Sequence, residues 1–193
     1  MSERILNVSH KEEIEYNGKK FRSNLETQTA KTLDALGIPY SYEEKKIVLQ
    51  DKFRCPYQKD MVRQVTYTPD FTVGPLMLEC KGFETPEWKI KKKLVFKWLM
   101  ENEPDTIFYQ IHDARKQLLE ALDAHWTYLG YCIAVTSKGT RKKPSETKCY
   151  DSLKEAMEDL GLKGKPIGAI LKSLTGKAEW VYGYSWTLKR IEL

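Results

Sequence analysis

The chain has 193 residues, which suits one large domain or one full domain with a small appendage, and it can bury a core without disulfides. Lysine and arginine total 32 against 27 for aspartate and glutamate, so the net charge of +5 permits a polyanionic partner without requiring one. The cysteines Cys55, Cys80, Cys132 and Cys149 form no CxxC pair. That spacing argues against a zinc finger and against a disulfide framework.

The first residues are polar and contain no apolar core of a signal peptide. No apolar run approaches the roughly 20 residues that a membrane helix requires. We therefore expect a cytoplasmic protein with reduced thiols and no membrane partner. A P-loop and a dinucleotide-binding glycine fingerprint are also missing from the sequence, so we expect no nucleotide cofactor.

The first strong pattern is a helix over residues 23–36. Its apolar residues recur at helical spacing, Gly37 follows as a stop signal, and Ser23 with Glu26 fits the S-x-x-E capping box. Residues 51–60 are expected to form a loop. The other strands and helices of this part are expected over 40–50, 61–68, 76–81, 86–102, 106–111 and 114–125. This mixture predicts an α/β domain with a mixed sheet flanked by helices.

The remainder of the chain differs in composition. Residues 136–148 contain no large apolar side chain and several cations, which predicts a basic linker between a first domain over 1–135 and a small, mostly helical module over 149–193. Helices are expected over 151–160 and 166–174. A unit of this size buries little surface by itself, so it should dock or act as a minimal binding module.

The chemistry is concentrated where two expected strands end. Asp70 closes one strand, and Glu79, Cys80 and Lys81 end the next; alternation places Glu79 and Lys81 on one face. A hairpin would bring Asp70 beside Glu79. Two carboxylates hold Mg²⁺, with Mn²⁺ as a substitute, and the Cys80 carbonyl can complete the ligand shell. The metal would activate water, and the lysine would orient that water or neutralise the phosphorane.

Two ordinary explanations compete with this hypothesis. Lys81 would form a plain surface salt bridge with Glu79 or Asp70, because P-D…E-x-K is a loose pattern. Glu26 would serve only as the capping partner of Ser23. A carboxylate that swings between the cap and a metal would combine both roles of Glu26.

Four sequence blocks then make the pattern specific. FRSNLE (21–26), LGIPYSYEE (36–44), YTPDF (67–71) and LECKG (78–82) occur in order. The chain over about 20–112 thereby resembles the PD-(D/E)XK nucleases, and within them the bacteriophage endonuclease I family of Holliday-junction resolvases. The resemblance implies an endonuclease fold, a homodimer that exchanges N-terminal strands, and a phage-encoded protein that acts in a bacterial host.

The resemblance also implies catalytic roles for Glu26, Asp70, Glu79 and Lys81. The first three residues would be metal ligands. The 51–66 segment is longer than the family leads us to expect.

The C-terminal unit carries a second resemblance, through Ser152, Glu155, Ala156, Leu160, Gly161, Ile167, Leu171, Gly176, Gly183, Tyr184 and Trp186. This frame is similar to the small DNA-binding repeats appended to homing endonucleases, whose second helix would enter the major groove. The alternative is a protein-docking or dimerisation module. The cations expected to contact DNA are Lys89, Lys91, Lys92, Lys93, Lys97, Arg141, Lys142, Lys143, Lys163, Lys165, Lys172 and Lys177.

The leading hypothesis is therefore a Mg²⁺-dependent DNA endonuclease of the homing type, targeted to a sequence and built on an endonuclease I-like core. The alternative within this class is a resolvase that selects branched DNA by shape. A non-catalytic DNA-binding protein and a protein-docking module are the remaining classes. Added salt would separate the last of these, because phosphate-driven binding weakens steeply with salt.

Overall fold

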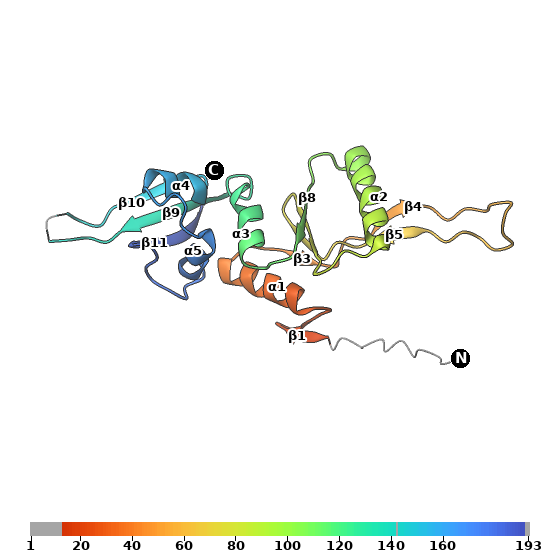
Figure 1. Cartoon of the computed structure of the whole chain (residues 1–193), viewed down its shortest axis with the longest axis horizontal. Coiled ribbons are helices and arrows are strands. Elements are labelled where there is room, and N and C mark those ends of the chain that lie inside the picture. Colours follow the sequence, from red (N-terminus) through yellow and green to blue (C-terminus); the bar gives the residue numbers. More distant parts are fainter. Residues whose placement is uncertain (1–12, 142, 192–193) are drawn as a thin grey trace.

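The computed structural model describes residues 13–141 and 143–191 of the chain. It is an elongated α/β structure with a mixed central sheet and, within those residues, five helices (Figure 1). The chain's described helices include none that is both long and apolar enough to span a bilayer. The expected α/β class with a mixed sheet and flanking helices is therefore confirmed.

The central sheet has the strand order β3-β6-β7-β8. Its strands are β3 (Ser41–Tyr42), β6 (Phe71–Val73), β7 (Leu76–Cys80) and β8 (Ile107–Ile111). β7 pairs antiparallel with β6 through a turn at Gly74 and parallel with β8. All five residues of β7 are buried, as its apolar run predicted, because helices cover both of its faces.

The two faces of β7 belong to different hydrophobic clusters. Leu76, Leu78 and Cys80 pack in a large cluster with α1 (Asn24–Leu36) and α3 (Lys116–Asp123). Met77 packs in a smaller cluster with Tyr67 and with α2 (Pro86–Asn102). The strict alternation of a strand thus sends odd-numbered residues toward α2 and even-numbered residues toward α1.

Local signals define the helix ends. Ser23 caps α1 by accepting a hydrogen bond from the Glu26 backbone N–H (3.2 Å), and α1 ends at Gly37 in the left-handed region. Thr85 caps α2 in the same way through Trp88. Both helices begin and end close to where their sequences place them.

The predicted loop over 51–60 lies at the outer end of two paired strands. Residues 51–60 form no regular strand. They extend an antiparallel ribbon of β4 (Ile47–Gln50) and β5 (Val65–Tyr67) outward through a single bridge between Phe53 and Val62. This ribbon projects from one end of the molecule (Figure 1). The strand expected over 61–68 contains β5, whereas the single strand expected over 40–50 is divided into β3 and β4.

The prediction of a linker over 136–148 is wrong. This segment contains the end of β9 (Tyr131–Ser137), a hairpin loop and the start of β10 (Thr147–Tyr150). β9 also pairs with β11 (Tyr184–Arg190), which gives a three-stranded antiparallel sheet. α4 (Leu153–Asp159) and α5 (Ile167–Leu174) complete the unit, so it is α/β rather than mostly helical. A hairpin loop and a linker are both polar, and composition cannot separate them.

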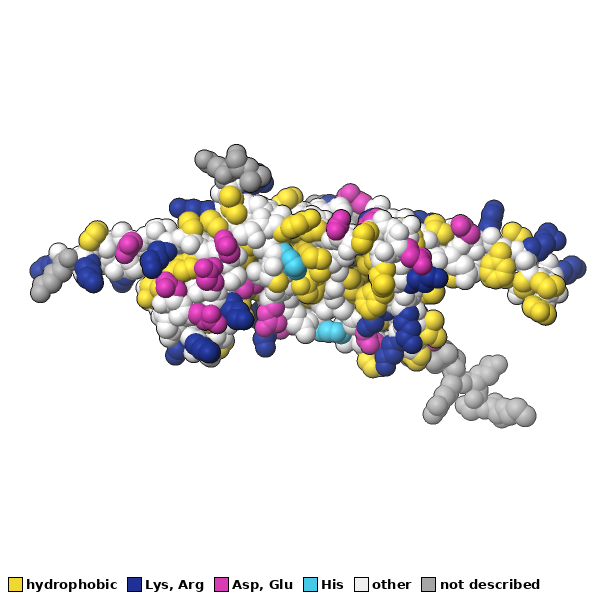
Figure 2. All heavy atoms as spheres, turned by 90° about the horizontal axis from the view of Figure 1, so that it is seen from above, with side chains coloured by type: hydrophobic (Ala, Val, Ile, Leu, Met, Phe, Trp, Pro, Cys, Tyr) yellow, Lys and Arg dark blue, Asp and Glu magenta, His cyan; other side chains and the backbone are white. Residues whose placement is uncertain are grey.

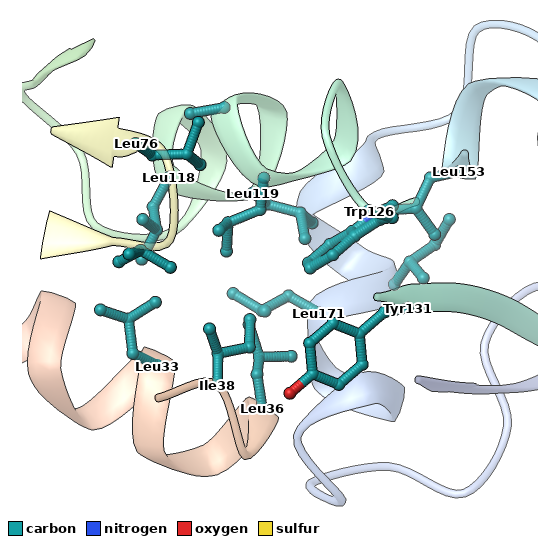
Figure 3. Close-up of a cluster of buried hydrophobic side chains, with 14 of the residues drawn as sticks. Leu33, Leu36, Ile38, Leu76, Leu118, Leu119, Trp126, Tyr131, Leu153 and Leu171 are labelled. Atoms are coloured by element: carbon teal, nitrogen blue, oxygen red, sulfur yellow. The ribbon is translucent and has the colours of Figure 1, made fainter. Parts of the chain in front are cut away.

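The C-terminal unit shares a core with the central domain. Figure 3 shows Leu36 and Ile38, at the end of α1, beside Tyr131 and Leu171. The Tyr131 hydroxyl donates to the Gly37 carbonyl at 3.3 Å. The two parts are therefore joined by continuous packing, which a flexible linker would not provide.

A buried aspartate strengthens this joint. Asp123, at the end of α3, accepts hydrogen bonds from the indole N–H of Trp126 (2.8 Å) and from the backbone N–H of Leu153 (2.6 Å) at the start of α4. A charge this deep is stabilised only by such donors. Asp123 thereby ties the first turn of α4 to the central domain.

The N-terminal strands β1 (Ile14–Tyr16) and β2 (Lys19–Phe21) form a hairpin with each other. Residues 1–12 lie outside the described residues. Exchange of N-terminal strands in a homodimer stays a prediction from the resemblance.

Candidate active site

Asp70 and Glu79 meet at the end of the β6–β7 hairpin. The register pairs Phe71 with Leu78, which brings Asp70 beside the last residues of β7. An Asp70 carboxylate oxygen accepts a hydrogen bond of 2.6 Å from the Cys80 backbone N–H. The predicted juxtaposition of these two acids is therefore confirmed, and its cause is the tight turn between the strands.

Glu79 and Lys81 lie on the α2 side of the sheet, as alternation predicted. Glu79 is only 4% exposed, and its carboxylate accepts a hydrogen bond of 2.8 Å from the Tyr67 hydroxyl. The Lys81 ammonium lies 3.4 Å from the other Glu79 oxygen and 5.0 Å from the centre of the Trp88 ring. The Lys81 backbone N–H donates to the Ile111 carbonyl, which extends the pairing with β8.

The pKa values of both acids are raised. Burial, followed by the negative charge of Glu79, raises the pKa of Asp70 to about 8. Burial also raises the pKa of Glu79, while the hydrogen bond from Tyr67 and the charge of Lys81 lower it in part. Among the described residues, the buried Glu79 and the partly buried Asp70 face only one nearby ammonium, that of the partly exposed Lys81, within 4 Å. A site with such a shortage of positive charge favours a bound cation.

Glu26 lies in the first turn of α1 and is 6% exposed. Its carboxylate accepts hydrogen bonds from the Ser23 hydroxyl (2.6 Å), the Tyr42 hydroxyl (2.6 Å) and the Arg22 backbone N–H (3.1 Å). The capping box is therefore present. The Glu26 charge also contributes to the raised pKa of Asp70. Glu26 is thus close enough to affect Asp70 electrostatically, while its own oxygens accept hydrogen bonds from other donors.

The donor set fits a hard divalent cation. Carboxylate oxygens of Asp70 and Glu79, together with the Cys80 carbonyl between Glu79 and Lys81 in sequence, are the ligand types that Mg²⁺ prefers. Within residues 13–141 and 143–191, no three acidic, histidine or cysteine side chains form a ready metal-binding group. The fit therefore rests on the Asp70–Glu79 pair and on its shortage of positive charge.

Several partners of the site were not predicted. Tyr67 holds Glu79, Tyr42 holds Glu26, and Thr29 contacts the Cys80 sulfur at 3.4 Å. Gln110 on β8 accepts hydrogen bonds from the Trp88 indole and from Lys92, both at 3.1 Å. Tyr67 and Tyr42 lie inside two of the four sequence blocks of the nuclease resemblance, which was a usable signal. Gln110 and Thr29 carry no such signal.

The predicted cations of α2 have different environments. Lys91 lies over the Tyr67 ring at 5.8 Å and lowers the pKa of Glu79 through its charge. Lys92 pairs with Glu84, and Lys97 lies 3.8 Å from Glu101. Lys89 and Lys93 are exposed. The helix therefore presents fewer free charges than its sequence suggests.

The C-terminal cations fall into three groups. Arg141 and Lys143 lie in the exposed β9–β10 loop, and Lys142 lies outside the described residues. Lys163 and Lys165 line one surface cleft with Glu120 and Glu158, and Lys172 and Lys177 line another. Figure 2 shows basic side chains gathered at both tips of the molecule, over the β9–β10 loop and the β4–β5 ribbon.

Comparison of the chain with protein-family models, with curated proteins and with solved structures gives no match. The functional argument therefore rests on the geometry described above.

Proposed function

We propose that the protein is a metal-dependent DNA endonuclease with its phosphodiester-cutting centre at the end of β7. The observation that carries the proposal is the meeting of Asp70 and Glu79 beside Lys81, in a buried place with too little positive charge. A structural salt bridge alone would need no second acid there, because Lys81 already contacts Glu79.

Each residue then has a distinct role. Asp70, Glu79 and the Cys80 carbonyl would hold Mg²⁺, which supplies Lewis-acid polarisation of the phosphate and a hydroxide near neutral pH. Lys81, held over the Trp88 ring, places a positive charge next to the reacting phosphate. Tyr67 fixes the orientation of Glu79 through its 2.8 Å hydrogen bond. Glu26 adds negative potential, and release from Ser23 and Tyr42 would free it as a further ligand.

The substrate is proposed to be DNA because basic side chains gather at both tips of the molecule (Figure 2), and Lys81 and Lys91 lie near the Glu79 carboxylate. A sequence-targeted, homing-type enzyme is the leading candidate, with the C-terminal unit as the addressing device. A junction resolvase is the second candidate. It is favoured by the shared core around Tyr131 and Leu171, because that core fixes the C-terminal cations relative to the acids, as recognition of a branched shape requires.

A cleavage assay with Mg²⁺ tests the proposal. It would offer a four-way junction, its matched linear duplex and a pool of long natural DNA to the wild type, to Asp70→Asn and to the control Asp105→Asn, an exposed acid before β8. We expect loss of about 10³-fold or more for Asp70→Asn with DNA binding retained, since metal catalysis contributes several kcal/mol. The control should cut normally.

The substrate pattern separates the candidates. Cutting of the junction alone indicates a resolvase, and cutting of linear DNA at a few discrete sites indicates a homing-type enzyme. Absence of any metal-dependent cutting by the wild type would refute the nuclease proposal and leave a DNA-binding protein.

A further inference from the structure

A cleft of about 250 Å³ separates α1 from α5, away from the carboxylate site; it joins the predicted DNA contacts Lys172 and Lys177 with two cations that were not predicted to bind DNA, Lys31 and Arg115. One wall is the outer side of α1, and the other is α5 with the residues that follow it; these helices lie beside each other in Figure 1. Its lining residues include Lys31, Arg115, Lys172 and Lys177. The four cations come from three separate parts of the sequence.

The charge of this cleft is unusual because none of the described residues that line it is acidic. Within the described part of the chain, none of the four cations forms an ion pair; Lys31 instead lies over the Tyr16 ring at 5.2 Å. The adjacent cleft differs, since its lysines are interleaved with Glu120, Asp123 and Glu158. Like charges gathered around a hollow repel one another, and an anion removes that cost.

The neutral lining groups do not compensate the charge. The hydroxyls of Thr32 and Thr175 donate to carbonyls within their own helices, at 2.9 and 2.7 Å. Gly168 contributes no side chain, so a ligand can approach the α5 backbone there. The cleft is thus a small open site whose charged groups, among residues 13–141 and 143–191, are all cationic.

We propose that this cleft binds a backbone phosphate of the nucleic acid, so that one strand is held at the joint between the central domain and the C-terminal unit. The proposal rests on the proposed nuclease function for the identity of the anion. α1 carries Glu26 in its first turn and Lys31 five residues later, a rise of about 7–8 Å along the axis. A single rigid helix therefore connects the bound phosphate to the acidic centre.

The test measures DNA binding without cleavage, in the full-length Asp70→Asn background. The affinity for a labelled duplex and for a four-way junction would be measured across a salt series. The cleft variant is Lys31→Gln with Lys172→Gln. The control is Lys116→Gln with Lys154→Gln, which makes the same charge change at exposed lysines of the adjacent cleft.

We expect the cleft variant to reduce the slope of log affinity against log salt by about 1 for each phosphate that its side chains no longer neutralise. The control should keep the slope of the parent. An equal reduction in the two variants, or an unchanged slope in the cleft variant, would overturn the proposal. Both substituted side chains of the cleft variant are exposed, and a thermal melt verifies that it folds.

Inorganic phosphate provides the second arm. Stabilisation of the parent by phosphate, with loss of that effect in the cleft variant and a changed DNA slope, supports the site. If phosphate stabilises the parent but the cleft variant keeps the parent's salt dependence of DNA binding, the cleft binds a free anion. That outcome would overturn the nucleic-acid proposal. Because these experiments measure binding and not cleavage, they test the phosphate site even if the protein proves not to be a nuclease.

Discussion

The end of β7 and the cleft between α1 and α5 carry charges of opposite sign in different environments. At β7, Asp70 and Glu79 are largely removed from water and are held by Cys80 and Tyr67. In the cleft, the cations extend into solvent on flexible side chains without an acidic partner among the described residues. The first region is rigid and lacks positive charge, whereas the second is open and lacks negative charge. One suits a metal ion, and the other suits a phosphate.

In the proposed nuclease, the residues that cut DNA and the residues that bind its backbone lie in separate regions of the molecule. A metal centre needs preorganised ligands, and the hairpin and the buried donors that hold these acids would provide that preorganisation. Backbone contacts need only charge within reach, so lysines on helix surfaces are sufficient. The shared core around Trp126 and Tyr131 holds the two regions at a constant separation.

The largest effect that would sharpen this contrast concerns Lys81, whose ammonium contacts Glu79. Lys81→Met keeps the length of the side chain and removes its charge. We expect a loss of about 10²–10³-fold in the single-turnover cleavage rate, because a preorganised charge at a developing anion contributes that much. The exposed Lys89→Met serves as the control and should affect binding alone. A decrease of less than about threefold for Lys81→Met, well short of that contribution, would remove this lysine from the chemistry.

A smaller effect concerns the joint between the two regions. Asp123→Ala leaves the Trp126 indole and the Leu153 backbone N–H without their acceptor. We expect a decrease of about 2–3 kcal/mol in the free energy of unfolding, as for buried hydrogen bonds to a charged group. Urea unfolding followed by tryptophan fluorescence measures it. The wild type should unfold in one transition because the core is shared, and two separate transitions would show that the two parts fold independently.

The smallest effect is a dependence on pH and metal in the acidic region. The pKa of Asp70 is raised to about 8 from its ordinary value of 3.8, so the folded state retains a proton that the unfolded state has lost. Without metal, this group therefore lowers stability as the pH rises from about 4 to 8. Asp70→Asn should remove that part of the decline and raise the Tm at pH 8 relative to the wild type.

Magnesium should act differently on the two proteins. It should raise the Tm of the wild type at pH 8 and leave Asp70→Asn nearly unchanged, since bound ligand stabilises the folded state. A thermal melt series with and without Mg²⁺ decides the matter. An equal rise in both proteins would place the ion elsewhere on the surface.

The acidic region could be predicted from the sequence because the residues that form it are close together along the chain. Ser23 and Glu26 are three residues apart, and Asp70 and Glu79 are joined by one short hairpin. Alternation along β7 then placed Glu79 and Lys81 on one face. These relationships depend on spacing within a few residues, and the structure confirms them.

The cleft and the C-terminal sheet were not readable in this way. β9 pairs with β11, and β10, α4 and α5 lie between them in the sequence. No sequence pattern near 136–148 predicts that pairing. Strands β4 and β5 fall inside expected strands, whereas the bridge that extends them at Phe53 lies in a polar segment without apolar alternation.

The sequence by itself determined the helices, the buried strand β7 and the acids that meet at its end, because short-range geometry fixes each of them. Only the tertiary structure decided that the C-terminal unit shares the core and that Lys31, Arg115, Lys172 and Lys177 surround one cleft. Such arrangements depend on which buried surfaces of distant segments pack together. The packing of distant segments is determined by the sum of many weak contacts, and no single sequence motif predicts it.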